Sequence, residues 1–334
     1  YKYMSNQPPI GVPQGAIRLN TDSQKLEFYA QDRWYEMATE ISSPIAGRGI
    51  SFSGSSGSNS IEYVNIPTLG DAIDFGDRTQ NVEPSQNACA SYIRAFFGGG
   101  EGNTDRIEFV TIATTGDAID FANLTQSRGA GPAGVSNSTR GIWGGGRTPG
   151  TQSTIDFIQF ASNADATDFG DLSQARQWPG GFQSPTRGFF FGGNPGSFPS
   201  VRNTIDFITM SSTGNAVDFG DMNRRSQIGS GVSSKTRGLM AGGQSTPTPN
   251  TDVIDFIEMQ TLGDAFDFGD LTTGTKGKAG MTNCVRGIFA GGSTPSETNV
   301  MEYVIISTKG NTIDFGDSVD TGFSAGTSNA HGGL

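Results

Sequence analysis

The chain has 334 residues, of which 49 are glycine and only 16% are charged, a composition with too much glycine for a helical protein. Its 23 Phe, 7 Tyr and 3 Trp supply enough apolar volume to fill hydrophobic cores, which argues against disorder. The net charge of −11 disfavours binding to nucleic acid or anionic lipid, and no run of about 20 apolar residues could insert into a membrane.

The first 45 residues predict a small β-meander. Three segments read as strands because apolar and polar side chains alternate along them: 15–21, 25–30 and 33–37. A sheet of this size is too small to be stable alone. Its aromatic side chains are therefore expected to be exposed, namely Tyr29, Trp34 and Tyr35. We interpret residues 1–45 as an element that attaches the chain to a partner.

Six copies of one repeat occupy the rest of the chain, residues 46–334. Each copy has an arginine before an apolar run, then an apolar–acidic–aromatic triplet, then an Asp-Phe pair. The arginines are Arg48, Arg94, Arg140, Arg187, Arg237 and Arg286, and the triplet acids are Glu62, Glu108, Asp156, Asp206, Asp255 and Glu302. The Asp-Phe pair begins 13 residues after the triplet in every copy, whereas the distance from arginine to triplet varies from 13 to 18 residues. Nearly all variation in length therefore falls in one loop.

The repeat predicts an all-β fold. A unit of 46 to 50 residues, with three or four short strands separated by glycine turns, is typical of a blade of a β-propeller. Residues 326–332 resemble the segment that precedes each arginine, for example 134–141, and the first copy lacks this segment. We therefore predict a six-bladed β-propeller closed by the C-terminal strand, with a first blade built from residues 46–79 and 323–334.

The repeat resembles the kelch family of β-propellers. The second strand of a kelch blade ends in Gly-Gly, as in 241–243, although Asp-Phe-Gly-Asp, as in 218–221, stands where kelch blades often place Trp. The variant looks more specifically like propellers in virion structural proteins of tailed bacteriophages, including those that infect marine cyanobacteria. Residues 15–35 resemble a short element of phage fibre and tail proteins. These resemblances imply a virion protein with a kelch-like domain.

The recurrent charged residues invite two chemical interpretations. The Asp-Phe-Gly-Asp sequences suggest calcium, but no copy has the dense acidic ladder of a calcium loop, so we interpret these aspartates as turn residues and predict no metal site. A residue repeated in every blade usually serves packing, because a ligand would contact the blades unequally. We predict that the six arginines form buried ion pairs with the six triplet acids of their own blades.

An enzyme is disfavoured, and no cofactor is expected. The single histidine, His331, cannot supply a set of metal ligands. It is more plausibly an ordinary residue of a strand than the base of a Ser-His-Asp triad. A glycoside hydrolase with a pair of catalytic carboxylates stays open as an alternative, because acidic residues are plentiful and the distance between them cannot be read from the sequence.

The sequence thus favours a non-enzymatic virion structural protein displayed on a tail, fibre or capsid surface. Its expected partners are other virion proteins, through residues 1–45, and a glycan or protein of the host surface, and a homo-oligomer is compatible with it. The alternatives are a carbohydrate-active enzyme that uses the propeller opening and a bacterial surface adhesion module.

The variable loop supplies candidate binding residues. Its longest copies are 194–203 and 244–252. Phe198 and Arg202 are residue types that anchor interfaces, and prolines stiffen both loops, namely Pro195, Pro247 and Pro249. The competing interpretation is that the loops are tolerated surface insertions.

Overall fold

The computed structural model describes residues 11–20, 25–36, 47–53, 58–81, 86–100, 102–246 and 250–334. The chain divides into two compact units, Tyr1–Ala46 and Gly47–Leu334. All regular secondary structure in the described residues is β-strand, so the predicted all-β class is confirmed. The described part of the chain accordingly contains no helix able to cross a membrane.

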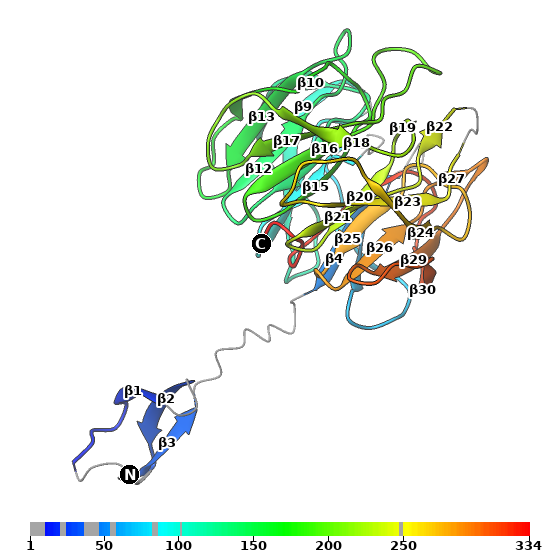
Figure 1. The fold of residues 1–334 in the computed structure, drawn as a ribbon. Coiled ribbons are helices and arrows are strands. Elements are labelled where there is room, and N and C mark those ends of the chain that lie inside the picture. The colour runs from blue at the N-terminus through cyan, green and yellow to red at the C-terminus, as the bar shows by residue number, and fades with distance from the viewer. Residues whose placement is uncertain are drawn as a thin grey trace. The chain divides into compact units, whose positions relative to one another are not determined.

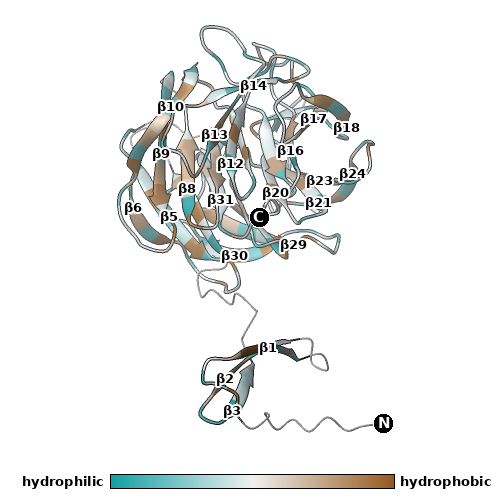
Figure 2. Ribbon diagram, turned by 90° about the vertical axis from the view of Figure 1, so that its left-hand side faces the viewer, coloured by the Kyte–Doolittle hydropathy of each residue, from teal (hydrophilic) through white to brown (hydrophobic). Residues whose placement is uncertain are grey.

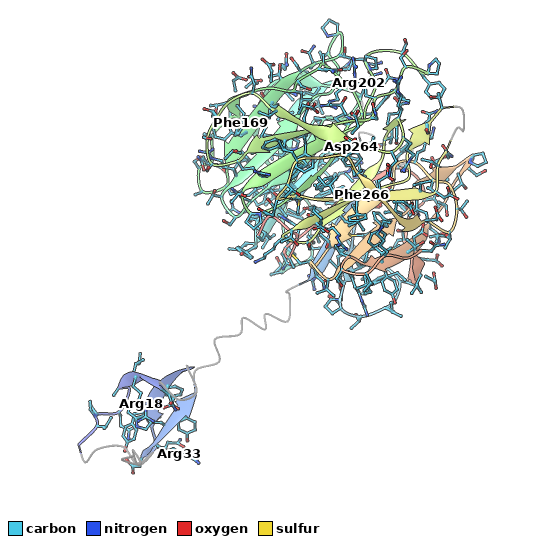
Figure 3. The ribbon with its side chains drawn as sticks, viewed as in Figure 1. Arg18, Arg33, Phe169, Arg202, Asp264 and Phe266 are labelled. Carbon is cyan, nitrogen blue, oxygen red and sulfur yellow. The ribbon has the colours of Figure 1, made fainter. Side chains whose placement is uncertain are left out.

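The smaller unit is a three-stranded antiparallel sheet in the order β1, β2, β3 (Figure 1). Its strands are β1 (Ile17–Asn20), β2 (Lys25–Ala30) and β3 (Arg33–Glu36). Tyr29 is only 8% exposed, so the expectation of three exposed aromatics is wrong for this residue. Its ring packs 5.3 Å from that of Trp34, and the guanidinium of Arg18 covers Trp34 at 4.3 Å. Arg18 and Arg33 both belong to this sheet (Figure 3).

The described residues of the larger unit form six four-stranded antiparallel sheets, which we number 1 to 6 along the chain (Figure 1). Sheet 1 has β31 (Ser324–Ser328), β4 (Arg48–Ser53), β5 (Ser60–Asn65) and β6 (Ile73–Asp77). Sheet 2 has β7 (Ala88–Ala90), β8 (Arg94–Gly98), β9 (Thr104–Thr111) and β10 (Ile119–Arg128). Sheet 3 has β11 (Ala133–Ser136), β12 (Arg140–Gly144), β13 (Thr154–Gln159) and β14 (Thr167–Asp171).

The other three sheets repeat this order. Sheet 4 has β15 (Gly180–Gln183), β16 (Arg187–Phe191), β17 (Thr204–Thr209) and β18 (Val217–Asp221). Sheet 5 has β20 (Ser230–Ser233), β21 (Arg237–Ala241), β23 (Val253–Glu258) and β24 (Phe266–Asp270). Sheet 6 has β25 (Ala279–Thr282), β26 (Arg286–Ala290), β29 (Val300–Ile305) and β30 (Ile313–Asp317). Two short ribbons join loops: β19 (Ser226–Gln227) with β22 (Gln244–Ser245), and β27 (Ser293–Thr294) with β28 (Ser296–Glu297).

The first strands of the six sheets contact one another in cyclic order: β31, β7, β11, β15, β20, β25 and again β31. One position in each of these strands carries a very small residue: Ala88, Gly134, Gly181, Gly231, Gly280 and Gly326. A Cβ atom on Gly231 would lie 2.1 Å from the carbonyl oxygen of Gly181. The strands can therefore approach this closely only because their side chains are absent or minimal.

The C-terminal strand joins the first sheet. β31 pairs with β4, and Thr327 lies opposite Ile50. The amide oxygen of Asn329 accepts hydrogen bonds from the N–H groups of Gly47 and Arg48, at 3.1 and 3.0 Å. Asn137 accepts an equivalent bond from the N–H of Arg140 within the continuous chain. The two ends of the larger unit thus reproduce a turn that other sheets make without a break.

A β-bulge explains the Asp-Phe-Gly-Asp sequences. In sheet 3, Ile155 lies opposite Gly170 and Asp156 lies opposite Asp168, so Phe169 is the extra residue. Phe169 is buried and meets the triplet residue Phe157 edge-on, with ring centroids 5.7 Å apart. Apolar side chains of neighbouring sheets form the cores, and the strands that carry them stand out in Figure 2.

Candidate functional site

The six repeat arginines are not paired with the triplet acids of their own sheets, so that prediction is wrong. In sheet 3, Arg140 lies opposite Gln159, whereas Asp156 lies opposite Trp143, three residues away along the strand. Three residues of extended chain separate the two groups by about 10 Å. The guanidinium groups instead lie 4.3–5.0 Å from the aromatic rings of the triplets: Arg48 on Tyr63, Arg94 on Phe109, Arg140 on Phe157, Arg187 on Phe207, Arg237 on Phe256 and Arg286 on Tyr303.

Five of these arginines also join neighbouring sheets. Each donates a hydrogen bond of 2.7–3.2 Å to the carbonyl oxygen that follows the third strand of the next sheet: Arg48 to Ile112, Arg140 to Met210, Arg187 to Met259, Arg237 to Ile306 and Arg286 to Ile66. Arg94 is the exception, because within the described residues no hydrogen bond joins its guanidinium to the protein. The position equivalent to the five acceptors is Phe160.

The triplet acids do form a buried set, but their partners come from the end of the preceding sheet or from the connection that leads into each sheet. Four of them pair with a cation there: Asp156 with Arg128, Asp206 with Arg176, Asp255 with Arg224 and Glu302 with Lys278. Glu62 accepts bonds from the N–H groups of Val319 and Asp320, at 3.0 and 2.6 Å. Burial raises the pKa of Glu62, because the low polarity of the site disfavours the charged carboxylate.

Sheet 2 uses a related arrangement. Glu108 accepts a hydrogen bond of 2.9 Å from the N–H of Thr79. Burial lowers the pKa of Arg78 to about 10, although the nearby Glu108 carboxylate opposes this. All six triplet acids therefore serve the junctions between sheets, which leaves none of them free for chemistry on a ligand.

A second set of contacts links the outer strands of neighbouring sheets. An Asp or Asn side chain in the turn before the fourth strand accepts a bond of 2.9–3.1 Å from a backbone N–H of the preceding sheet: Asp117 from Asp77, Asp165 from Asn123, Asn215 from Asp171, Asp264 from Asp221, Asn311 from Asp270 and Asp71 from Asp317. The predicted turn aspartates, which begin the Asp-Phe pairs, are exposed instead. Within the described residues, no group of three or more acidic, His or Cys side chains is placed to hold a metal ion.

His331 lies in a turn after β31, not in a strand as expected. It is buried, and its Nε2 donates to the carbonyl oxygen of Ala90 at 2.9 Å, while its Nδ1 accepts from the N–H of Gly333 at 3.1 Å. Burial lowers the pKa of His331 to about 4, although the bond to Ala90 opposes the shift. The ring borders a cavity of about 20 Å³ among the first strands, and none of the described residues that line it carries a carboxylate. This arrangement holds the histidine neutral and gives it no acid partner for a triad.

The predicted loop residues are only partly presented to solvent. Phe198 is 47% exposed, while Pro195 and Arg202 are half-buried. Arg202 lies in the loop that follows β16 (Figure 3). The backbone N–H of Arg202 donates to the carbonyl oxygen of Gly193 at 2.8 Å. Pro247 and Pro249 lie outside the described residues.

A groove of about 480 Å³ lies between sheets 2 and 3, away from the predicted loops. It is lined by the turn between β7 and β8, the turn between β11 and β12, and the end of β13: Ser91, Tyr92, Ile93, Arg94, Ser138, Thr139, Gln159, Phe160 and Ala161. Tyr92 is 58% exposed and Ile93 is 64% exposed, while Phe160 is 9% exposed and forms an apolar floor.

One signal for this groove is visible in the sequence, in the two residues that precede the repeat arginine. The two residues before the arginine are Tyr92 and Ile93 in the second copy, where the next three copies have 138–139, 185–186 and 235–236, which read Ser-Thr, Pro-Thr and Lys-Thr. The sixth copy also has apolar residues there, Cys284 and Val285, so the feature particular to the second copy is the aromatic Tyr92.

No model of a known protein family matches the chain, and no curated protein matches it either.

Proposed function

We propose that residues 47–334 form a six-bladed, kelch-like β-propeller. Six sheets of equal strand order, cyclic contacts among their first strands and the pairing of β31 with β4 support this proposal. Each junction between neighbouring sheets has one of the hydrogen bonds from a backbone N–H to an Asp or Asn side chain. The junction from sheet 6 to sheet 1 has the bond from the N–H of Asp317 to Asp71.

We further propose that the protein is a non-enzymatic structural and binding protein of a tailed-phage particle. The observation that supports this most directly is the use of the repeated charged groups: the triplet acids are buried at the junctions, and among the described residues no carboxylate lines the cavity beside His331 or the groove. A glycoside hydrolase needs two carboxyl groups beside its substrate. The assignment to a virion comes from the resemblance of the repeat and of residues 15–35 to phage proteins.

Labelled imaging of purified particles tests the proposal. An antibody against the larger unit, visualised on intact particles by electron microscopy, is expected to mark one structure on the particle surface. Particles that lack the protein would overturn the virion assignment. Release of shortened chains from host polysaccharide by the purified protein would overturn the non-enzymatic assignment.

The smaller unit supplies a separate test of attachment. Ile17, Phe28 and Tyr35 lie opposite one another on one face of the small sheet, and Ile17 is 64% exposed. Deletion of residues 1–40 is expected to leave a folded larger unit, monitored by circular dichroism, that no longer enters particles. Normal incorporation of the truncated chain would refute the attachment role.

A further inference from the structure

We infer that the groove between sheets 2 and 3 binds a sugar residue that carries a single carboxylate. The choice of a glycan rests on the proposed surface-binding role, and the site and the chemistry come from the groove itself. At about 480 Å³, the groove lies within the range of small-ligand sites in proteins.

The unpaired guanidinium of Arg94 provides the charge recognition. At five junctions the equivalent arginine donates to a carbonyl oxygen of the next sheet, whereas Arg94 is held only by its stacking on Phe109, at 4.8 Å. Its N–H donors are therefore available in the groove, and a planar guanidinium matches a carboxylate with two parallel hydrogen bonds. Among the described residues that line the groove, Arg94 alone is charged. The groove therefore complements a ligand with one carboxylate, although the net charge of the protein is −11.

The rest of the lining suits a sugar ring. Tyr92 presents an exposed aromatic ring and Phe160 an apolar floor, both able to contact the C–H face of a pyranose. Ser138 and Gln159 are exposed, and their side chains are free to hydrogen-bond hydroxyl groups. Aromatic surface, amide and hydroxyl groups around one guanidinium fit a ligand that is apolar on one face and rich in oxygen at its edge.

The backbone of the groove argues against an extended peptide as the ligand. Peptides commonly bind by adding a strand to an unpaired sheet edge. Here the carbonyl oxygen of Ile93 already accepts from the N–H of Ile112, and that of Thr139 accepts from the N–H of Phe160. The turn N–H groups of Ile93 and Arg94 bond the hydroxyl of Ser91. These four backbone groups are therefore already bonded, and we assign ligand binding to the side chains.

The test uses the purified protein, residues 1–334, and a panel of oligosaccharides that each carry one uronic or sialic acid. Their carboxyl-reduced counterparts serve as neutral probes, and short peptides with a free C-terminal carboxylate serve as competing ligands. Isothermal titration is expected to show at least one acidic member that binds about tenfold or more tightly than its reduced counterpart. Arg94→Gln is expected to abolish that preference, and Tyr92→Ala to weaken binding about fivefold. Ser138→Trp, which fills the groove without altering Arg94, is expected to block binding.

Arg187→Gln is the matched control, because Arg187 occupies the same repeat position but donates to the carbonyl oxygen of Met259. It is expected to leave binding unchanged. No preference for acidic over reduced members, an unaltered preference in Arg94→Gln, or binding only to peptides with a free C-terminal carboxylate would each overturn the inference. Such a result, together with normal incorporation into particles, would leave the proposed virion role intact.

Discussion

The junction between sheets 2 and 3 is built differently from the other five. At those five, an arginine stacks on its triplet aromatic and donates to the next sheet. At the junction between sheets 2 and 3, Arg94 makes no such bond, and the rings of Phe96 and Phe160 stack 4.7 Å apart instead. Trp143 donates its indole N–H to the carbonyl oxygen of Asn87 at 2.9 Å, and His331 reaches Ala90 from the C-terminal tail.

The outer contact of the same junction also differs. Elsewhere a glycine of the Asp-Phe-Gly-Asp sequence lies against a glycine of the next sheet, as Gly170 does against Gly214. Ala122 and Ala164 stand at the equivalent positions of sheets 2 and 3. One junction can thus exchange its arginine contact for aromatic packing and keep the register of the repeat. An arginine released in this way becomes available to a ligand.

The largest expected effect comes from breaking a buried pair at a regular junction. Arg176→Met leaves the Asp206 carboxylate buried without its cation, since both side chains are fully buried. We expect a loss of about 3–5 kcal/mol in the free energy of unfolding, measured by urea denaturation. Arg106→Met is the control, because its pair with Asp120 is exposed and is expected to contribute less than about 1 kcal/mol. Equal losses in the two variants would contradict the assignment of the buried pairs to the junctions.

The second prediction concerns the histidine that supports the exceptional junction. The pKa of His331 is about 4 in the folded chain against an ordinary 6.5, so the unfolded chain binds the extra proton between these values. Stability should therefore fall as the pH decreases from about 6.5 to about 4, by about 3 kcal/mol at most. His331→Gln cannot take up that proton. The difference in unfolding free energy between the two proteins should change across this pH window, and a constant difference would show that His331 is not held neutral.

A glycine variant tests the outer contact. Gly170 has a φ of +144°, and a Cβ atom there would lie 2.5 Å from the carbonyl oxygen of Gly214. Gly170→Ala is therefore expected to cost about 1–3 kcal/mol in thermal or chemical unfolding. The reciprocal change at the exceptional junction, Ala122→Gly, should cost only about 0.5–1 kcal/mol through added chain entropy. No loss, or a gain, from Ala122→Gly would mean that this contact favours glycine at all six junctions.

The smallest effect compares the two classes of arginine directly. Arg187→Gln removes ring stacking and the bond to Met259, and is expected to cost about 1–2 kcal/mol. Arg94→Gln removes only the stacking on Phe109, with an expected cost of about 0.5–1 kcal/mol. Differential scanning calorimetry of both variants in parallel would resolve the order. A greater loss from Arg94→Gln would contradict the view that Arg94 is free of the next sheet.

Sequence reasoning predicted the all-β class, the strands around each anchor and the return of the C-terminal segment to the first sheet. These features follow from spacing alone, because the repeats reveal equivalent positions without any knowledge of contacts. The partners of Arg140 and Asp156 were not predictable in this way. Spacing along the chain does not give the register of the hairpin, and that register separates the two residues by three positions.

The cations that do pair with the acids were hidden by irregular spacing. Arg128 and Arg176 each lie 8 residues after the start of an Asp-Phe pair, but Arg224 lies 6 and Lys278 lies 11 residues after theirs. The groove was hidden for a different reason. Tyr92 departs visibly from the repeat, yet the groove also depends on Phe160 and on a hydrogen bond that Arg94 does not make, and both are properties of packing.

The pairing of β31 with β4 has a consequence for how the chain is made. Arg48 and Thr327 belong to neighbouring strands although almost the whole larger unit separates them in sequence, so this contact forms only after Ser328 has left the ribosome. Until then β4 presents an unpaired edge, and the first strands of sheets 2 and 6 lack the neighbour that lies between them in the finished structure. Any nascent chain that ends before residue 324 keeps that edge open, which exposes it to strand exchange with other chains and to proteolysis.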